Sequence, residues 1–206
     1  MKARKFKGIW PLPGGTTAYV STLTRILRRI QKTNPTFDEL LEWFKSEYNL
    51  TGEQTPKSTL EYLRRFGFFK KSDGKLFLSE ESLKFLETEK HEIIYNILNS
   101  AVLGFDDILS WLYKNALTLE EIYKRLIKKY DLDWKTNTQV LFRLNWLRSL
   151  GYVEKRGRNY ILTKQGEKVV EEIISEREGI ERPITIKPKL IPPEKKDIVG
   201  EPIYFR

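Results

Sequence analysis

The feature that most constrains the fold of this chain is an internal repeat. The residue pattern of Thr36–Glu87 returns about 82 to 84 residues later, in Thr118–Glu172. Each copy opens with Thr-x-x-Glu, the pattern of a helix capping box, and later places a glycine after an apolar helical face. Two unrelated segments would rarely agree in caps, core positions and glycine together. We therefore interpret the chain as a tandem duplication of one structural unit.

The second copy shows the order of elements in this unit most clearly. Thr118 opens a first helix, and a second helix with apolar residues on one face ends at Gly151. Two β-prone runs, Tyr152–Val153 and Tyr160–Leu162, then flank a glycine-containing basic stretch, which predicts a hairpin with a positively charged tip. Thr163 is the expected N-cap of a last helix.

The first copy predicts the same elements with a different hairpin tip. Thr55-Pro56 favours a helix start, with proline in the first turn, and the second helix is expected over residues 56–66. Its hairpin tip spans residues 70–75, in which Asp73-Gly74 is a strong turn signal. An amphipathic helix over Thr16–Lys32 precedes this copy, after a basic arm at residues 1–7 that we expect to be flexible.

Helix, turn, helix and basic hairpin together resemble the winged helix-turn-helix family along the whole unit. The resemblance implies a mainly α fold, α+β in the wings, with two tandem units joined by a helical connector. The endings Leu63–Phe69 and Trp146–Val153, each followed by a wing and a capped helix, are also similar to the N-terminal recognition region of prokaryotic restriction-endonuclease-like proteins. In winged-helix proteins the second helix usually enters the DNA major groove.

The predicted organisation has four parts. Residues 1–90 hold the basic arm, a helix and the first winged helix; residues 91–117 form the connector; and residues 118–178 form the second winged helix. Residues 179–206 read as an extended, proline-containing tail. Because the tail ends on an apolar, strand-like run, we expect it to lead into a further C-terminal domain, of the nuclease type if the resemblance holds.

Composition favours a polyanionic partner and excludes several kinds of site. The chain of 206 residues carries a formal net charge of +9 and an isoelectric point near 9.5, which favours nucleic acid. The alternative is a Lys/Glu-rich surface of the kind found in thermophiles. Such a surface explains the large number of charges but not the excess of positive over negative charge at both hairpin tips. The chain has no cysteine and one histidine, which leaves no thiolate metal site, no disulfide and no histidine cluster. We expect a cytoplasmic protein that needs no cofactor, holds no metal and has no catalytic site of its own.

Candidate DNA contacts lie on the second helix and the hairpin tip of each copy. Asn and Gln can pair with adenine, Lys and Arg with guanine, and cations at a hairpin tip can follow phosphates. In the first copy the candidates are Lys57, Ser58, Glu61, Arg65, Lys70, Lys71 and Lys75. In the second copy they are Lys135, Thr136, Asn137, Thr138, Gln139, Arg143, Lys155, Arg156 and Arg158.

The function predicted on this basis is a non-catalytic module that binds double-stranded DNA, as a monomer or homodimer. A winged-helix transcriptional regulator is one alternative, and it would dimerise on a palindromic site. A tandem winged-helix adaptor that binds proteins and not DNA is the other alternative. It would tolerate charge reversal at both hairpin tips.

Overall fold

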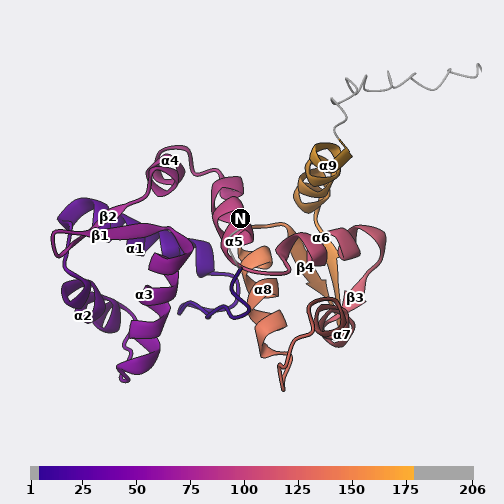
Figure 1. Cartoon of the computed structure of the whole chain (residues 1–206), viewed down its shortest axis with the longest axis horizontal. Helices are drawn as coiled ribbons and strands as arrows, with labels where there is room; N and C mark the ends of the chain where they lie inside the picture. Colours follow the sequence, from indigo (N-terminus) through magenta and orange to yellow (C-terminus); the bar gives the residue numbers. More distant parts are fainter. Residues whose placement is uncertain (1–4, 179–206) are drawn as a thin grey trace, which may run out of the picture.

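A computed structural model describes residues 5–178, with side chains through residue 175. The described chain is mainly helical, with two small antiparallel sheets, as predicted (Figure 1). The elements are α1 (Tyr19–Thr33), α2 (Phe37–Glu47), α3 (Gln54–Phe66), β1 (Phe69–Ser72), β2 (Lys75–Leu78), α4 (Glu80–Thr88), α5 (His91–Ala101), α6 (Phe105–Lys114), β3 (Leu117–Thr118), α7 (Leu119–Tyr130), α8 (Thr138–Ser149), β4 (Val153–Arg156), β5 (Asn159–Leu162) and α9 (Lys164–Glu178). The order of helix, helix, hairpin and helix therefore occurs twice, as α2–α4 and as α7–α9.

Both predicted capping boxes are present. The hydroxyl of Thr36 accepts from the amide of Glu39, whose carboxylate accepts in turn from the amide of Thr36. Thr118 and Glu121 make the same pair of bonds at the start of α7. Because these bonds satisfy donors that a helix start leaves unpaired, they fix where each unit begins.

The second helix of each unit ends at its glycine. Gly67 and Gly151 have φ angles of 95° and 81°, in the left-handed region where a side chain would be strained. The next amides, of Phe68 and Tyr152, bond back to carbonyls near the helix end at 3.2 and 2.9 Å. This shared turn aims the chain from the helix into the hairpin in both units.

Each hairpin is also joined to the start of its unit, a feature that sequence analysis missed. β3 pairs with β5 through Leu117 and Tyr160, and in the first unit Thr36 forms an isolated bridge with Lys75. A pairing of one or two residues leaves no alternating pattern that sequence analysis could detect. These matching contacts agree with a duplication, which stays an interpretation.

The hairpin turns differ as their sequences predict. Asp73 and Gly74 have φ angles of 49° and 78°, and the two positive angles are those of a type I′ turn. In the second hairpin Gly157 takes the positive angle, at 60°, between the paired residues Arg156 and Asn159.

The predicted start of the second helix in the first unit is wrong by two residues. α3 begins at Gln54 and not at Pro56, so Thr55 lies inside the first turn. Its carbonyl accepts from the hydroxyl of Thr59 at 2.9 Å. Pro56 is tolerated because the first turn of a helix does not need its amide hydrogen.

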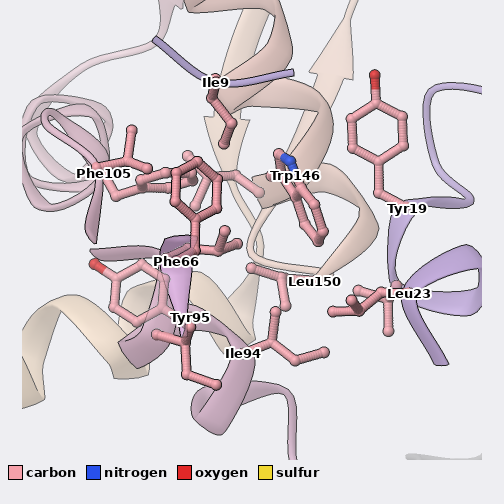
Figure 2. Packing of buried hydrophobic residues seen from close by; sticks show 14 of the residues in the cluster. Ile9, Tyr19, Leu23, Phe66, Ile94, Tyr95, Phe105, Trp146 and Leu150 are labelled. Carbon is pink, nitrogen blue, oxygen red and sulfur yellow. The ribbon is translucent and has the colours of Figure 1, made fainter. Parts of the chain in front are cut away.

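The two units share one hydrophobic core. Figure 2 shows Tyr19 of α1, Phe66 at the end of α3, Ile94 of α5, Phe105 of α6 and Trp146 of α8 in the same cluster. The connector helices α5 and α6 are buried along one side within it. The boundaries of the predicted domains stay a prediction, but the cores of the two units are continuous.

Residues 5–13, called the N-terminal strap below, pass between α3 and α8 (Figure 1). Phe6 pairs with Val102 in a parallel bridge, and Ile9 and Leu12 are buried. The expectation of a flexible arm is therefore wrong for residues 5–7. Residues 1–4 and the predicted tail at 179–206 lie outside the described residues.

Candidate nucleic-acid interface

A groove of about 810 Å³ runs along the outer face of α3. It is bounded by the start of α2 and by the β1–β2 hairpin, and four cations and two acids line it. The lining residues are Thr36, Phe37, Asp38, Gln54, Lys57, Ser58, Glu61, Tyr62, Arg64, Arg65, Lys71 and Gly74. α3 presents this face because Leu60, Leu63 and Phe66 point into the core from the opposite one.

Glu61 and Arg64 form a two-point ion pair in the groove. The Nε and Nη2 atoms of Arg64 donate to Oε2 and Oε1 of Glu61 at 3.0 and 2.5 Å. The pair lies one turn apart on α3, so it forms within a single helix. Its hydrogen bonds lower the pKa of Glu61 and raise that of Arg64, and Glu61 is ionised near neutrality.

Arg65 is exposed, but its position is set by the strap. Its guanidinium lies 4.5 Å from the ring centre of Phe6 and 5.8 Å from that of Tyr62. A cation over an aromatic face is attracted to it, and the charged edge stays open to solvent. The strap thus orients a cation that can contact an anionic partner.

The first hairpin carries the predicted cations on its surface. Lys70, Lys71 and Lys75 are exposed, and Lys71 also lines the α3 groove. Asp73 at the tip accepts from the hydroxyl of Ser72 at 3.2 Å. Lys71 places positive charge on the side of the hairpin next to α3, and the strand register puts Lys70 and Lys75 on the other face.

The matching face of α8 is covered by the start of α1. The hydroxyl of Ser149 accepts from the amide of Val20 at 2.8 Å and donates to the carbonyl of Thr17 at 3.0 Å. Asn145 and Trp146 are 2% and 1% exposed, and both contact Tyr19. α8 is therefore a central helix of the molecule and not an exposed one.

The prediction that Arg143 faces outward toward DNA is wrong. Its side chain is 0% exposed, and its three guanidinium nitrogens donate to the carbonyls of Leu103, Gln139 and Lys7 at 2.7 to 2.8 Å. The guanidinium also lies 4.8 Å from the ring centre of Trp134. Burial lowers the pKa of Arg143 to about 9, so the group remains charged near neutrality and requires these acceptors.

The side chain of Gln139 also makes a hydrogen bond within the molecule and does not point freely into solvent. Its Oε1 accepts from the amide of Ile9 at 2.8 Å, which joins α8 to the strap. Of the predicted run before and at the start of α8, Lys135, Thr136 and Thr138 are exposed and Asn137 is half-buried. The exposed residues of this predicted run therefore lie at the N-terminal edge of α8.

The second hairpin is less positive than its tip sequence indicates. Arg156 pairs with Glu154 at 2.6 Å, and the ammonium of Lys155 lies 5.9 Å from the ring centre of Tyr160. Glu154 lies in the same strand as Arg156, two residues earlier, and its negative charge offsets one of the three predicted cations. Lys155 and Arg158 remain exposed cations at this end of the molecule.

On α3 itself, three residues line the groove that were not among the predicted contacts. They are Gln54, Tyr62 and Arg64. The i, i+3 spacing of Glu61 and Arg64 is a sequence signal for their ion pair, and it was available in advance. Tyr62 gave no such signal, because its place depends on the strap.

Other kinds of site find little support within residues 5–178. No group of three or more His, Cys, Asp or Glu in this part of the chain could hold a metal ion. Nδ1 of His91 lies 3.0 Å from the carbonyl oxygen of Leu150, a contact between α5 and the end of α8. No helix of the described chain is long and apolar enough to cross a membrane.

Comparison with known proteins gives only a distant likeness. No protein-family model matches the chain, and no curated protein matches it in sequence. Among solved structures, the chain is similar to the protein in "Crystal structure of pyrene- and phenanthrene-modified DNA in complex with the BpuJ1 endonuclease binding domain". The likeness has a TM-score of 0.45 and 14% identity, over 81% of this chain and 84% of that chain. A likeness this distant defines neither the fold nor the function of the present chain.

Proposed function

We propose that this protein binds double-stranded DNA by placing α3 in the major groove. The observation that carries the proposal is the open, cation-lined groove along α3, beside the positive β1–β2 hairpin. In this arrangement Lys57 and Ser58 face base edges or the groove walls, and Lys71 of the hairpin contacts the adjacent phosphates.

The dimensions of α3 suit this partner. An α-helix with its side chains is roughly 10–12 Å across, and the major groove of B-DNA is about 12 Å wide. α3 has 13 residues and is therefore about 20 Å long, enough to cross the groove. Its polar side is continuous from Gln54 to Arg65, which supplies both hydrogen-bonding groups and charge.

The second unit takes a supporting part in this proposal. With most of α8 buried, its exposed cations Lys135, Lys155 and Arg158 are available for phosphates but are not arranged along an open helix. The unit would add sequence-independent affinity. We assign the chain a target-recognition role without catalysis, as in the non-catalytic part of a restriction-type nuclease.

The test is fluorescence anisotropy with a labelled duplex of mixed sequence, titrated at several salt concentrations. Lys57→Glu/Lys71→Glu reverses two groove charges, and Lys84→Glu/Lys168→Glu is the matched control, because these two exposed lysines of α4 and α9 do not line the groove. We expect the wild type and the control to bind with steep salt dependence. The groove variant should bind at least ~10-fold more weakly and lose about one unit of salt slope, for the phosphate contact of Lys71.

A third variant separates the contributions of the two units. Lys155→Glu/Arg158→Glu should weaken binding less than the groove variant and should leave any sequence preference unchanged. Equal loss of affinity in the groove variant and the α4/α9 control would contradict the proposed site. Absence of wild-type binding near ~100 μM duplex at modest salt, weaker than ordinary non-specific binding, would leave the protein-binding adaptor as the better hypothesis.

A further inference from the structure

We infer that Glu61 is a specificity-determining residue that accepts a hydrogen bond from the exocyclic amino group of one cytosine or adenine. The inference rests on the proposed DNA-binding function and specifies its chemistry. It follows from the position of Glu61, from the hydrogen bonds that its carboxylate oxygens accept from Arg64, and from the hydrogen-bonding groups that bases present in the major groove.

Glu61 lies in the middle of the open face of α3. Lys57 is one turn before it and Arg65 one turn after it, and all three line the groove. The side chain is 41% exposed, so its carboxylate is open to the groove and is not shielded by the core. A helix seated in a major groove would bring this central position closest to the base edges.

Arg64 leaves the carboxylate with a defined pair of free acceptor positions. It donates one hydrogen bond to each oxygen of Glu61, and a carboxylate has about four lone-pair positions. The two-point pair also fixes the plane of the carboxylate, so the remaining lone pairs point in set directions. An ionised carboxylate accepts and cannot donate, so the partner group must be a donor.

Only two bases offer a donor in the major groove. Cytosine presents its N4 amino group and adenine its N6 amino group, whereas guanine and thymine present acceptors at the corresponding positions. A phosphate is excluded because it too is an acceptor with negative charge. Glu61 therefore favours cytosine or adenine at one position and disfavours guanine or thymine there.

A purely structural role explains the position of Glu61 less well. An exposed ion pair within one helix contributes only about 0.3–0.5 kcal/mol to stability. A carboxylate among Lys57, Arg64, Arg65 and Lys71 also weakens attraction to phosphates by repulsion. A groove that only attracted phosphates would bind more tightly without this negative charge.

The experiment is selection from a randomised duplex library, followed by binding measurements on the selected site with each of the four base pairs at every position. Wild type, Glu61→Ala and Arg64→Ala are compared with Glu42→Ala. The control removes the acid of another i, i+3 ion pair, Glu42 with Lys45 on α2, outside the groove. Circular dichroism melts establish that each variant is folded.

We expect the wild type and Glu42→Ala to select cytosine or adenine at one position, by roughly 10-fold or more over guanine and thymine. The four-base comparison also shows which of the two amino groups is bound. Glu61→Ala should lose the preference at that position alone and bind non-specific duplex as tightly as the wild type or more tightly. Arg64→Ala should retain a reduced preference, because the carboxylate remains but its orientation is lost.

Several results would overturn the inference without touching the proposed function. These are an unchanged preference in Glu61→Ala, wild-type binding without preference at any position, or a folded Glu61→Ala protein that no longer binds. The last result would mean that Glu61 supports binding in general and does not discriminate bases. Failure of the wild type to bind any duplex would reject both the inference and the proposed function.

Discussion

α3 and α8 occupy equivalent places in the two units but have opposite environments. With the glycine caps aligned, Glu61 and Arg65 of α3 correspond to Asn145 and Ser149 of α8. Glu61 and Arg65 line an open groove, whereas Asn145 and Ser149 contact the start of α1. The comparison teaches that one local structure can stay open to solvent in one unit and form the centre of the core in the other.

The cause of the difference is the segment that precedes the first unit. α1 begins at Tyr19, and the amide of Val20 in its first turn donates to the hydroxyl of Ser149 in α8. Tyr19 then packs edge-on against Trp146, with ring centres 5.3 Å apart. α1 packs on the outer face of α8 and leaves the outer face of α3 open.

The largest expected difference between the helices is the effect of aromatic truncation. Trp146 and Tyr62 are equivalent positions, the first 1% exposed and the second half-buried. Trp146→Ala should lower the free energy of unfolding by about 3–5 kcal/mol, because it leaves a large cavity. Tyr62→Ala should cost about 1–2 kcal/mol, because part of that ring is already in contact with water. Urea denaturation of both variants measures the difference, and similar losses would mean that α8 is not the central helix.

The next effect concerns Arg143 and its equivalent, Thr59. Arg143→Ala should destabilise the fold by about 3 kcal/mol, because it removes three hydrogen bonds from a fully buried guanidinium and leaves a cavity in its place. Thr59→Ala should cost about 1 kcal/mol, since its hydroxyl bonds only within α3. The measurement is again chemical denaturation, followed by duplex binding under conditions where both variants are folded. Folded Arg143→Ala that loses DNA affinity while keeping its stability would restore the original prediction for this residue.

The smallest effect tests a feature that the units share. The capping-box carboxylates Glu39 and Glu121 have lowered pKa values, mainly through hydrogen bonds from the backbone amides of Thr36 and Thr118. Because the folded-state pKa is the lower one, each contributes stability above the ordinary glutamate pKa and loses it as the pH falls through the folded value. Glu39→Gln and Glu121→Gln should each flatten the fall of thermal stability between pH 6 and about 3, by similar small amounts. A much larger effect of one substitution than of the other would show that the two capping boxes do not contribute equally to stability.

Much of the local structure could be read from the sequence because it depends on neighbouring residues. The capping boxes, the glycine turns at Gly67 and Gly151, and the Asp73-Gly74 hairpin turn each require a few adjacent groups with defined geometry. The α3 groove residues Lys57, Glu61 and Arg65 were also predicted, since the helical period places them opposite the core.

The environment of α8 was only partly available in the sequence. The same alignment puts Leu141, Phe142 and Trp146 on the face that is polar in α3, and an apolar outer face indicates a covered helix. That signal could have shown that α8 is buried. It could not show that α1 and the strap cover it, because contacts across more than a hundred residues leave no local pattern.

The sequence by itself thus determined the elements of each unit and their order, through caps, turns and helical periodicity acting over a few residues. The tertiary structure alone decided which segments cover α8 and leave α3 open. It did so by packing α1 against α8 and by passing the strap between α3 and α8, where Arg143 binds the carbonyl of Lys7. The physical reason is that burial of an apolar face is non-directional and can be satisfied by any complementary surface, so its partner depends on the whole fold.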